Sequence, residues 1–420
     1  MSENNIIDLK NPVEDGLTEF LRSSAQKMLK AAIEQEVQDF LGNYQNDLLE
    51  DGRKRLVRNG YLPERDIQTG IGSVEVQVPR VRDRGDVVEK ITFFPQWIPK
   101  YMRRTISLDK LLPLLYLKGI STGDFQTVLE PILGKDAANV SHSVISRMKS
   151  SWCSEYENFQ QQDLQRKKYI YWWADGIYLQ ARMEDDKRCV LVIIGVDESG
   201  KKELLTINDG FRESKESWLD LLRDLKERGL KSGPNLGIGD GALGFWGALQ
   251  EVFPETKKQR CWVHKTRNIL NKLPNSLQAK AKADLHNIYE ADSKKDAMKA
   301  FNKFIINYEL KHPKATLCLA KDIEALLKFY DFPAEHWQSI RTTNPIESTF
   351  ATVRHRTKKS KNCFSRNTIM ACVFKLIKNA ENNWRKLYGH KRIADVINLV
   401  RFVDGLPAMS APKNQHSIAA

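Results

Sequence analysis

The chain has 420 residues, of which 41% are hydrophobic, and its formal net charge is +13, with an isoelectric point near 9.3. This length predicts about two to four domains. The charge indicates an anionic partner, nucleic acid first, although ribosomal and membrane-surface proteins share it. The sequence lacks the apolar run of about 18 residues that a membrane span needs, and its polar N-terminus lacks a signal-peptide core. We therefore expect a cytoplasmic protein, nucleoid-associated when bound to DNA, with no membrane partner.

Cysteine usage also favours a reducing compartment. The six cysteines are scattered along the chain and form no Cys-x-x-Cys pair: Cys153, Cys189, Cys261, Cys318, Cys363 and Cys372. In a chain of this size, the pattern predicts reduced thiols rather than a disulfide framework.

Residues 1–105 are expected to form N-terminal helices and a basic β-ribbon. Between residues 17 and 50, apolar residues recur at three- and four-residue steps, which predicts one amphipathic helix, or a pair, that packs on a neighbour or a second subunit. Residues 73–78 alternate apolar and polar as a short ribbon does. The cations before this ribbon are Arg53, Lys54, Arg55 and Arg58. The basic ribbon is either an arm that contacts DNA or a solvated loop.

Residues 106–160 are predicted to form a helix-turn-helix DNA-binding domain. Three short helical patterns follow one another: the first ends near Gly119, the second opens at a Ser121 or Thr122 cap, and the third is basic. The DNA-contact candidates on the third are Ser141, His142, Ser143, Arg147 and Lys149. Three short helices also occur in proteins that never bind DNA, and here the basic charge favours the DNA interpretation.

From residue 165 the pattern becomes a mixed α/β order. Three successive strands, a helix, a short strand, a second helix and a fifth strand are predicted between residues 165 and 264. This is the order of an RNase H-like catalytic core, which residues 340–405 would complete after an all-helical insertion at 265–339. The tail at 406–420 is small and polar, and we expect it to be flexible.

Carboxylates lie beside glycines at two apolar segments of this core. Asp175 precedes Gly176 between two apolar runs, and Asp240 ends another apolar strand before a glycine. Asp-Gly is common turn chemistry, so each pair is open between a hairpin turn and a rigid shelf for a bound group. Glu347 falls in the first turn of a predicted long helix, where the helix dipole favours any carboxylate.

Taken together, the three carboxylates predict a metal site. Two strands of one sheet would bring Asp175 and Asp240 to one edge, and the helix that carries Glu347 would pack against it. Oxygen ligands of this kind suit Mg²⁺ or Mn²⁺. Two such ions, roughly 3.5–4 Å apart, support phosphoryl transfer, and the flanking glycines would let a nucleic-acid backbone approach closely.

With these residues the sequence resembles the mutator-type transposases that bacterial insertion sequences encode. The resemblance covers nearly the whole chain and rests on WADGIYL with Asp175, GDGALGFWGAL with Asp240, QRCWVHKTRNIL with Cys261 and His264, and TTNPIESTFATVRHRTK with Glu347 and Arg354. It implies that Asp175, Asp240 and Glu347 are the catalytic, metal-binding triad. It also implies hydrolysis at the ends of the element, then attack of the released 3′-hydroxyls on target DNA, without a nucleotide cofactor.

The resemblance marks Cys261 and His264 as a family signature that shapes the active site. Alone, such a pair supplies only half of a tetrahedral zinc site, and core packing of Cys261 is the alternative. Arg354 lies two helical turns after Glu347, where it would hold a phosphate. The cations that follow would track the DNA backbone unless they form a solvated helix end: Arg356, Lys358, Lys359 and Lys361.

Three tryptophans of this half receive separate predictions. Trp218 and Trp246 are expected in the core, whereas Trp262 is a candidate for stacking on a DNA base at the transposon end.

The sequence thus predicts a DNA transposase that acts on terminal inverted repeats and on target DNA. Pairing of two ends needs at least two subunits, so we expect a homodimer in the synaptic complex. Two alternatives stay open. An RNase H-like nuclease is disfavoured by the long insertion, and a non-catalytic DNA-binding protein derived from a transposase is disfavoured by the three retained carboxylates.

Overall fold

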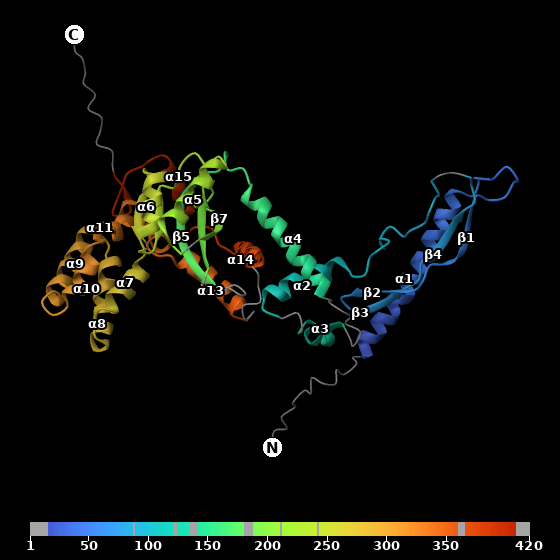
Figure 1. Ribbon diagram of the computed structural model, residues 1–420, viewed down its shortest axis with the longest axis horizontal. Helices are drawn as coiled ribbons and strands as arrows, with labels where there is room; N and C mark the ends of the chain where they lie inside the picture. The colour runs from blue at the N-terminus through green and yellow to red at the C-terminus, as the bar shows by residue number, and fades with distance from the viewer. Residues whose placement is uncertain are drawn as a thin grey trace, which may run out of the picture. The chain divides into compact units, whose positions relative to one another are not determined.

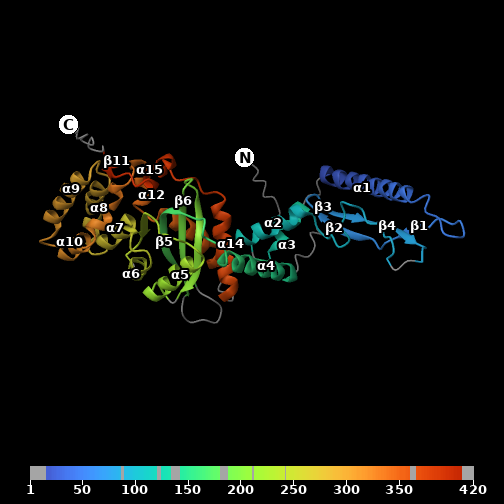
Figure 2. The ribbon, with the colours of Figure 1, turned by 90° about the horizontal axis from the view of Figure 1, so that it is seen from above.

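The computed structural model describes residues 16–86, 89–120, 124–133, 142–179, 188–210, 212–241, 243–359 and 366–408. The chain divides into two compact units, Met1–Met148 and Lys149–Ala420. Figures 1 and 2 show the elements of each unit. In the described part of the chain, none of the helices is long and apolar enough to span a bilayer.

In the first unit, one long helix packs on short strands (Figure 1). The sequence left open one helix or two, and the structure has a single one, α1 (Gly16–Asn43). The strands are β1 (Leu56–Tyr61), β2 (Arg65–Thr69), β3 (Gly72–Val76) and β4 (Pro79–Asp83), in two antiparallel pairs, β1 with β4 and β2 with β3. Val74 and Val76 enter one core with Ile33 and Val37 of α1. The predicted ribbon is therefore confirmed, and it is part of a packed layer.

Three helices follow in the order that the sequence predicted. They are α2 (Ile106–Leu117), α3 (Phe125–Leu133) and α4 (His142–Gln160). Gly119 lies just after the end of α2 and has a φ of +105°, a left-handed conformation that favours glycine. Tyr116 of α2 stacks on Phe125 of α3 at 6.5 Å between ring centroids. The predicted caps Ser121 and Thr122 lie outside the described residues.

The second unit contains a five-stranded mixed sheet, consistent with an RNase H-like core (Figure 2). Its strands are β5 (Tyr169–Leu179), β6 (Arg188–Asp197), β7 (Lys202–Gly210), β8 (Leu236–Gly239) and β9 (Lys257–Arg260), in the spatial order β7-β6-β5-β8-β9. The first three form an antiparallel meander, and β8 and β9 run parallel to β5. The predicted order of strands and helices is thereby confirmed.

The hairpin-turn interpretation of Asp175 and Gly176 is wrong. Both residues lie inside β5, where Asp175 pairs with Val192 and Gly176 with Leu191. The two apolar runs around them form one uninterrupted strand, which continues for four residues beyond Asp175. The strand is apolar on both sides of the carboxylate because both faces of the sheet are covered.

One face of the sheet is covered by α5 (Lys215–Glu227) and α6 (Leu243–Val252). Trp172 and Leu191 of the sheet pack there with Trp218 and Trp246, which confirms the two predicted core tryptophans. As predicted, α5 begins at a Ser214 cap, whose side chain accepts a hydrogen bond from the Ser217 backbone N–H at 3.2 Å.

The other face of the sheet is covered by later segments of the chain. Tyr171 lies 2.8 Å from Nδ1 of His336, and the Trp173 indole donates to the Ser339 carbonyl at 3.1 Å. The long helices on this side are α13 (Asn344–Lys359) and α14 (Arg366–Glu381). Because side chains alternate along a strand, Asp175 points to the same face as Tyr171 and Trp173, the face that α13 covers.

The segment between β9 and α13 is helical, as predicted. Its elements are α7 (Trp262–Leu270), α8 (Asn275–Tyr289), α9 (Lys294–Tyr308), α10 (Pro313–Ala320), α11 (Ile323–Leu326), η1 (Lys328–Asp331), η2 (Ala334–His336) and α12 (Trp337–Ile340). The stacking prediction for Trp262 is wrong: its side chain is fully buried, its indole donates to the Leu326 carbonyl at 2.8 Å, and it packs on Tyr289.

The chain ends in short elements on the second unit. These are η3 (His390–Arg392), α15 (Ile393–Ile397), β10 (Phe402–Val403) and β11 (Leu406–Pro407). The last two strands pair with each other, so the first residues of the expected tail belong to a hairpin. Residues 409–420 lie outside the described part.

Candidate active site

Two of the three predicted carboxylates are brought together by strand pairing. The parallel register of β5 and β8 ends with Ala174 opposite Gly239. The next residues, Asp175 inside β5 and Asp240 directly after β8, therefore lie side by side. Carboxylate oxygens of both lie within 4.8 Å of one another and of an oxygen of Glu213. Asp175 is thus held inside a strand, whereas Asp240 lies directly after one.

Glu347 reaches this region from the first turn of α13. One of its oxygens lies 3.3 Å from Nε2 of His264 and 3.1 Å from the hydroxyl of Thr343. Ligand atoms of Cys261, His264 and Glu347 all lie within 4.8 Å of one another. Cys261 and His264 therefore lie beside Glu347.

Cys261 connects the start of α13 to the sheet. Its backbone N–H donates to the Gly239 carbonyl at 2.8 Å, which extends the end of β8, and its Sγ accepts from the Thr343 backbone N–H at 3.3 Å. The Thr343 hydroxyl lies within hydrogen-bond distance of both Sγ, at 3.2 Å, and Glu347. These contacts hold Glu347 in a fixed relation to Asp240.

The electrostatics of the site reflect crowded negative charge. Burial, and then the Asp240 carboxylate, raise the pKa of Asp175 to about 7. Burial and the same neighbour raise the pKa of Glu213 to about 7. A hydrogen bond with Cys261, together with nearby negative charges, raises the pKa of His264 to about 9. The carboxylates therefore repel one another, and a bound cation would relieve that repulsion.

The donor atoms fit a hard divalent cation. Asp175, Asp240 and Glu213 offer oxygens, as Mg²⁺ and Mn²⁺ require. The second group, Cys261, His264 and Glu347, adds one sulfur and one nitrogen donor and is one donor short of a closed tetrahedral zinc site. Moreover, the Cys261 sulfur accepts a hydrogen bond from the Thr343 backbone N–H, and the Thr343 hydroxyl lies 3.2 Å from it.

The predicted DNA-contact residues on α13 differ in exposure. Arg354 is exposed, and its guanidinium lies 5.9 Å from the centre of the Phe350 ring. Arg356, in contrast, is buried, with 3% of its surface exposed, so its side chain points into the protein rather than towards solvent. The side chains of Lys358 and Lys359, and all of Lys361, lie outside the described part.

The predicted cations of the first unit also have different surroundings. Lys54 is exposed, and Arg53 forms an exposed ion pair with Asp51. Arg55 instead makes two 3.0 Å hydrogen bonds to the fully buried carboxylate of Asp83, which is a structural contact.

On α4, Arg147 is exposed and Lys149 is half-buried. Arg147 lines a hollow of the first unit together with Arg65, Lys100, Arg103 and Arg104. Ser141 and the side chains of His142 and Ser143 lie outside the described part.

Sequence reasoning missed Glu213. It directly precedes the Ser214 cap of α5, where an acidic residue suggests nothing beyond an ordinary helix start. One signal could have found it. Glu213 lies between β7 and α5, and the chain from there returns to the sheet that carries Asp175 and Asp240.

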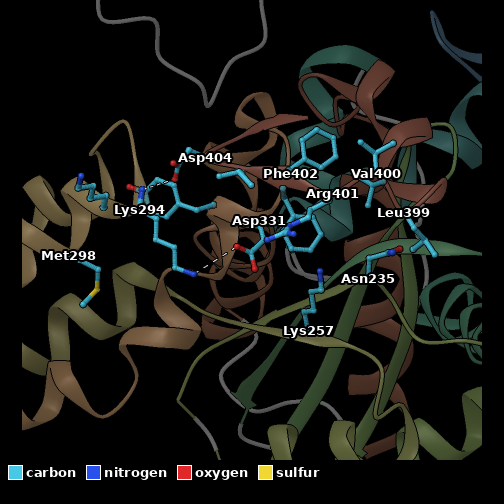
Figure 3. A pocket seen from close by; sticks show the side chains of 15 residues that line it. Asn235, Lys257, Lys294, Met298, Asp331, Leu399, Val400, Arg401, Phe402 and Asp404 are labelled. Atoms are coloured by element: carbon cyan, nitrogen blue, oxygen red, sulfur yellow. Dashed lines mark hydrogen bonds and ion pairs between the residues drawn. The ribbon is translucent and has the colours of Figure 1, made fainter. Parts of the chain in front are cut away.

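A separate cavity lies at the other end of the strands (Figure 3). Asn235 precedes β8 and Lys257 begins β9, whereas Asp240 follows β8. Its acidic residues are engaged: Asp331 lies 3.8 Å from the Lys294 amine, and Asp404 accepts from the Lys294 backbone N–H at 2.7 Å. This cavity is therefore distinct from the carboxylate site.

A mixed sheet of this order with carboxylates at one end is consistent with the RNase H-like class of nucleic-acid-processing enzymes. The sequence model of the family described as "Transposase, Mutator family" matches residues 3–387. The chain therefore belongs to the Mutator family of transposases and is an enzyme of DNA transposition.

Several transposases of insertion sequences are similar to the chain. The transposase for element IST2 of Acidithiobacillus ferrooxidans is 48% identical over 295 residues, covering 70% of this chain and 100% of the relative. The transposase for IS6120 of Mycolicibacterium smegmatis is 49% identical over 278 residues, 66% of this chain and 85% of the relative. The transposase for IS256 in transposon Tn4001 of Staphylococcus aureus is 30% identical over 306 residues, 72% and 75% of the two chains.

Proposed function

We propose that this transposase binds the terminal inverted repeats of its insertion sequence, cleaves at their ends and joins the 3′-hydroxyls to target DNA. The observation that carries the proposal is the parallel pairing of β5 with β8, which sets Asp175 beside Asp240. Glu347 lies on a different element, α13, and its negative charge makes a small contribution to the raised pKa of Asp175. We assign Asp175, Asp240 and Glu347 as the catalytic, metal-binding residues.

The proposed cofactor is Mg²⁺ or Mn²⁺, as two ions held by these carboxylates. Such ions activate a water or a 3′-hydroxyl and stabilise the leaving oxygen when they are bound. The protein's own contribution is to fix the carboxylates on a rigid strand, a strand end and a helix start, so that little reorganisation precedes the reaction. Neither a covalent protein–DNA intermediate nor a nucleotide cofactor is required.

His264 and Thr343 act as positioning residues for Glu347 in this proposal. Both contact the same carboxylate oxygen, at 3.3 and 3.1 Å, and both are tied to Cys261. Because the pKa of His264 is raised to about 9, its imidazolium form pairs with the carboxylate at neutral pH.

We assign Arg354 to the phosphate next to the reacting bond. It is exposed, and it lies on the helix that carries Glu347, two turns further on. Stacking near Phe350 restricts its guanidinium. Lys358 and Lys359 follow on the same helix and are proposed to track the DNA backbone, whereas the buried Arg356 is proposed to support the helix.

The first unit is proposed to hold the inverted repeats through its helix-turn-helix. The support is the hollow that Arg147 shares with four other cations and two carboxylates, Asp66 and Asp109, because an excess of positive charge binds phosphates. Lys149, the first residue of the second unit, lies two residues after Arg147 on α4, and the exposed Arg53 and Lys54 of the first unit are proposed as further backbone contacts. Arg55 is not part of the proposed DNA-binding surface, because it is hydrogen-bonded to Asp83.

We propose a homodimer in the synaptic complex, since two transposon ends must be paired. The candidate contact is α1, on which Phe20, Leu21 and Met28 are exposed by 46–74%. Exposed apolar side chains on one helix favour association with another protein surface.

An in vitro cleavage assay tests the catalytic proposal. Purified protein is mixed with DNA that carries the repeats flanking its gene, with Mg²⁺ or Mn²⁺, alongside Asp175→Asn, Asp240→Asn and Glu347→Gln. We expect metal-dependent nicks at the repeat ends with the wild type and loss of at least about 100-fold in rate with each variant. Glu216→Gln, an exposed carboxylate in the first turn of α5, is the matched control.

Other outcomes point to the alternatives. Binding of the repeats without cleavage by the wild type under either metal would favour the non-catalytic DNA-binding protein. A preference for RNA–DNA hybrids over the repeat ends would favour an RNase H-like nuclease.

A further inference from the structure

We propose that Glu213 is a fourth carboxylate of the active site and binds metal together with Asp175 and Asp240. This inference rests on the proposed function, because it concerns the same metal site. It adds a metal-binding residue from a different element, the start of α5, to the three that the sequence pattern picked out.

Glu213 lies close to both aspartates of the site. Oxygens of Asp175, Asp240 and Glu213 lie within 4.8 Å of one another, while Glu347 forms a neighbouring group with Cys261 and His264. In the described part of the protein, the group made of three carboxylates thus includes Glu213, whereas Glu347 lies 3.3 Å from Nε2 of His264 in the other group. A cation at the first set would have three oxygen donors of the kind that Mg²⁺ and Mn²⁺ prefer.

Two glycines leave room for Glu213, one for its side chain and one for its backbone. A Cβ on Gly176 of β5 would lie 2.7 Å from a Glu213 carboxylate oxygen and 2.8 Å from its Cγ. A Cβ on Gly244 of α6 would clash with the Glu213 carbonyl oxygen and lie 2.8 Å from the Ser214 carbonyl carbon. Backbone and carboxylate of Glu213 therefore each occupy space that only glycine leaves open.

The backbone at Glu213 is held in place by the helix that it precedes. The next residue, Ser214, caps α5 by accepting from the Ser217 N–H at 3.2 Å, and Trp218 and Leu222 bury the helix against the sheet. A capped and buried helix start does not swing freely, so it presents Glu213 at a constant distance from β5. The same cap would serve a purely structural helix, but such a helix does not need a half-buried carboxylate beside two others, which is electrostatically costly.

Direct metal binding to the full-length protein tests the inference. Mn²⁺ is titrated into the wild type, Glu213→Gln, Asp240→Asn and Glu216→Gln without DNA, and free Mn²⁺ is measured by electron paramagnetic resonance. We expect Glu213→Gln to weaken Mn²⁺ binding by about 10-fold or more, as Asp240→Asn does, and Glu216→Gln to bind like the wild type. Thermal unfolding without metal establishes that each variant is folded.

A second variant moves the carboxylate without removing it. Gly176→Ala places a methyl group where the Glu213 side chain lies, and we expect it to weaken Mn²⁺ binding as well. If Glu213→Gln retains wild-type affinity while Asp240→Asn loses it, this inference is overturned and the proposed metal site stands. If the wild type itself binds no Mn²⁺, or Asp240→Asn binds equally well, the metal site of the proposed function is overturned together with it.

Discussion

At the scale of single residues, Thr343 links the parts of the active site. Its backbone N–H and hydroxyl both reach Cys261 Sγ, and the hydroxyl also reaches Glu347. A hydroxyl carries one proton, so it donates to one of these acceptors at a time. Thr343 is buried and precedes α13, and it therefore acts through Glu347 rather than on DNA.

Thr343→Val removes this hydroxyl and keeps the shape of the side chain. We expect repeat-end cleavage to slow by about 10-fold or more, because Glu347 loses one of its two positioning contacts. DNA affinity should stay unchanged, as measured by fluorescence anisotropy on the same repeats.

Thr343→Ser is the matched control, since it restores the hydroxyl and should recover most of the rate. Equal loss in the Ser and Val variants would mean that packing, rather than the hydrogen bond, is responsible.

At the scale of elements, the contact between α5 and α6 depends on one glycine. Gly244 lies against the backbone at the start of α5, so a methyl group there meets Ser214 and Glu213 backbone atoms that cannot rotate away. For Gly247, one turn later on α6, the atoms nearest to an added Cβ belong to the flexible Lys215 side chain, at 3.3 Å or more.

These two glycines give opposite expectations for the same substitution. Gly244→Ala should lower the free energy of unfolding by about 2 kcal/mol, through overpacking. Gly247→Ala should raise it by up to about 1 kcal/mol, because alanine favours the helix. Urea unfolding followed by tryptophan fluorescence measures both, since every tryptophan except Trp97 lies in the second unit. Destabilisation by both variants, or by neither, would contradict this account of the contact.

At the scale of the whole molecule, the chain divides into two units, and the first has a polar anchor at Asp83. Its carboxylate is fully buried and accepts hydrogen bonds from Arg55 and from the backbone N–H groups of Gly85 and Ile91. The Arg55 guanidinium holds the pKa of Asp83 well below its usual range, despite burial.

The first unit should therefore lose stability in acid. A carboxylate whose pKa is depressed by folding stabilises the folded state above its unfolded pKa, and this contribution disappears as the pH falls below about 4. Hydrogen exchange of β1 and β4 peptides, corrected for intrinsic rates, should rise between about pH 5 and about pH 3. Arg55→Ala should raise the same exchange at neutral pH, whereas Arg53→Ala, which breaks an exposed pair, should not. Unchanged protection in Arg55→Ala would show that the ion pair is not the anchor.

Much of the architecture was predictable because it depends on local pattern. The strand and helix order of the second unit, the Ser214 cap and the ribbon near Val74 follow from periodicity and capping chemistry, which neighbouring residues carry. The family also followed from local motifs around Asp175, Asp240 and Glu347. The assignment of that triad remains a prediction that the cleavage assay tests.

Other features depend on which segments pack together, and no local pattern contains that information. Trp262 of α7 and Arg356 of α13 have the residue types of a DNA surface, yet both are buried. Asp175 and Gly176 have the composition of a turn, yet both pair with β6, so β5 continues through them. Glu213 lies close to Asp175 only because α5 folds back onto the sheet.

The sequence by itself therefore determined the elements, the basic character and the family of this transposase, since each is encoded in residue types and short spacings. The tertiary structure alone decided which side chains face each other at the carboxylate site and which cations reach the surface. The physical reason is that burial and charge proximity arise from long-range packing, which brings together residues as distant in the chain as Asp175 and Glu347.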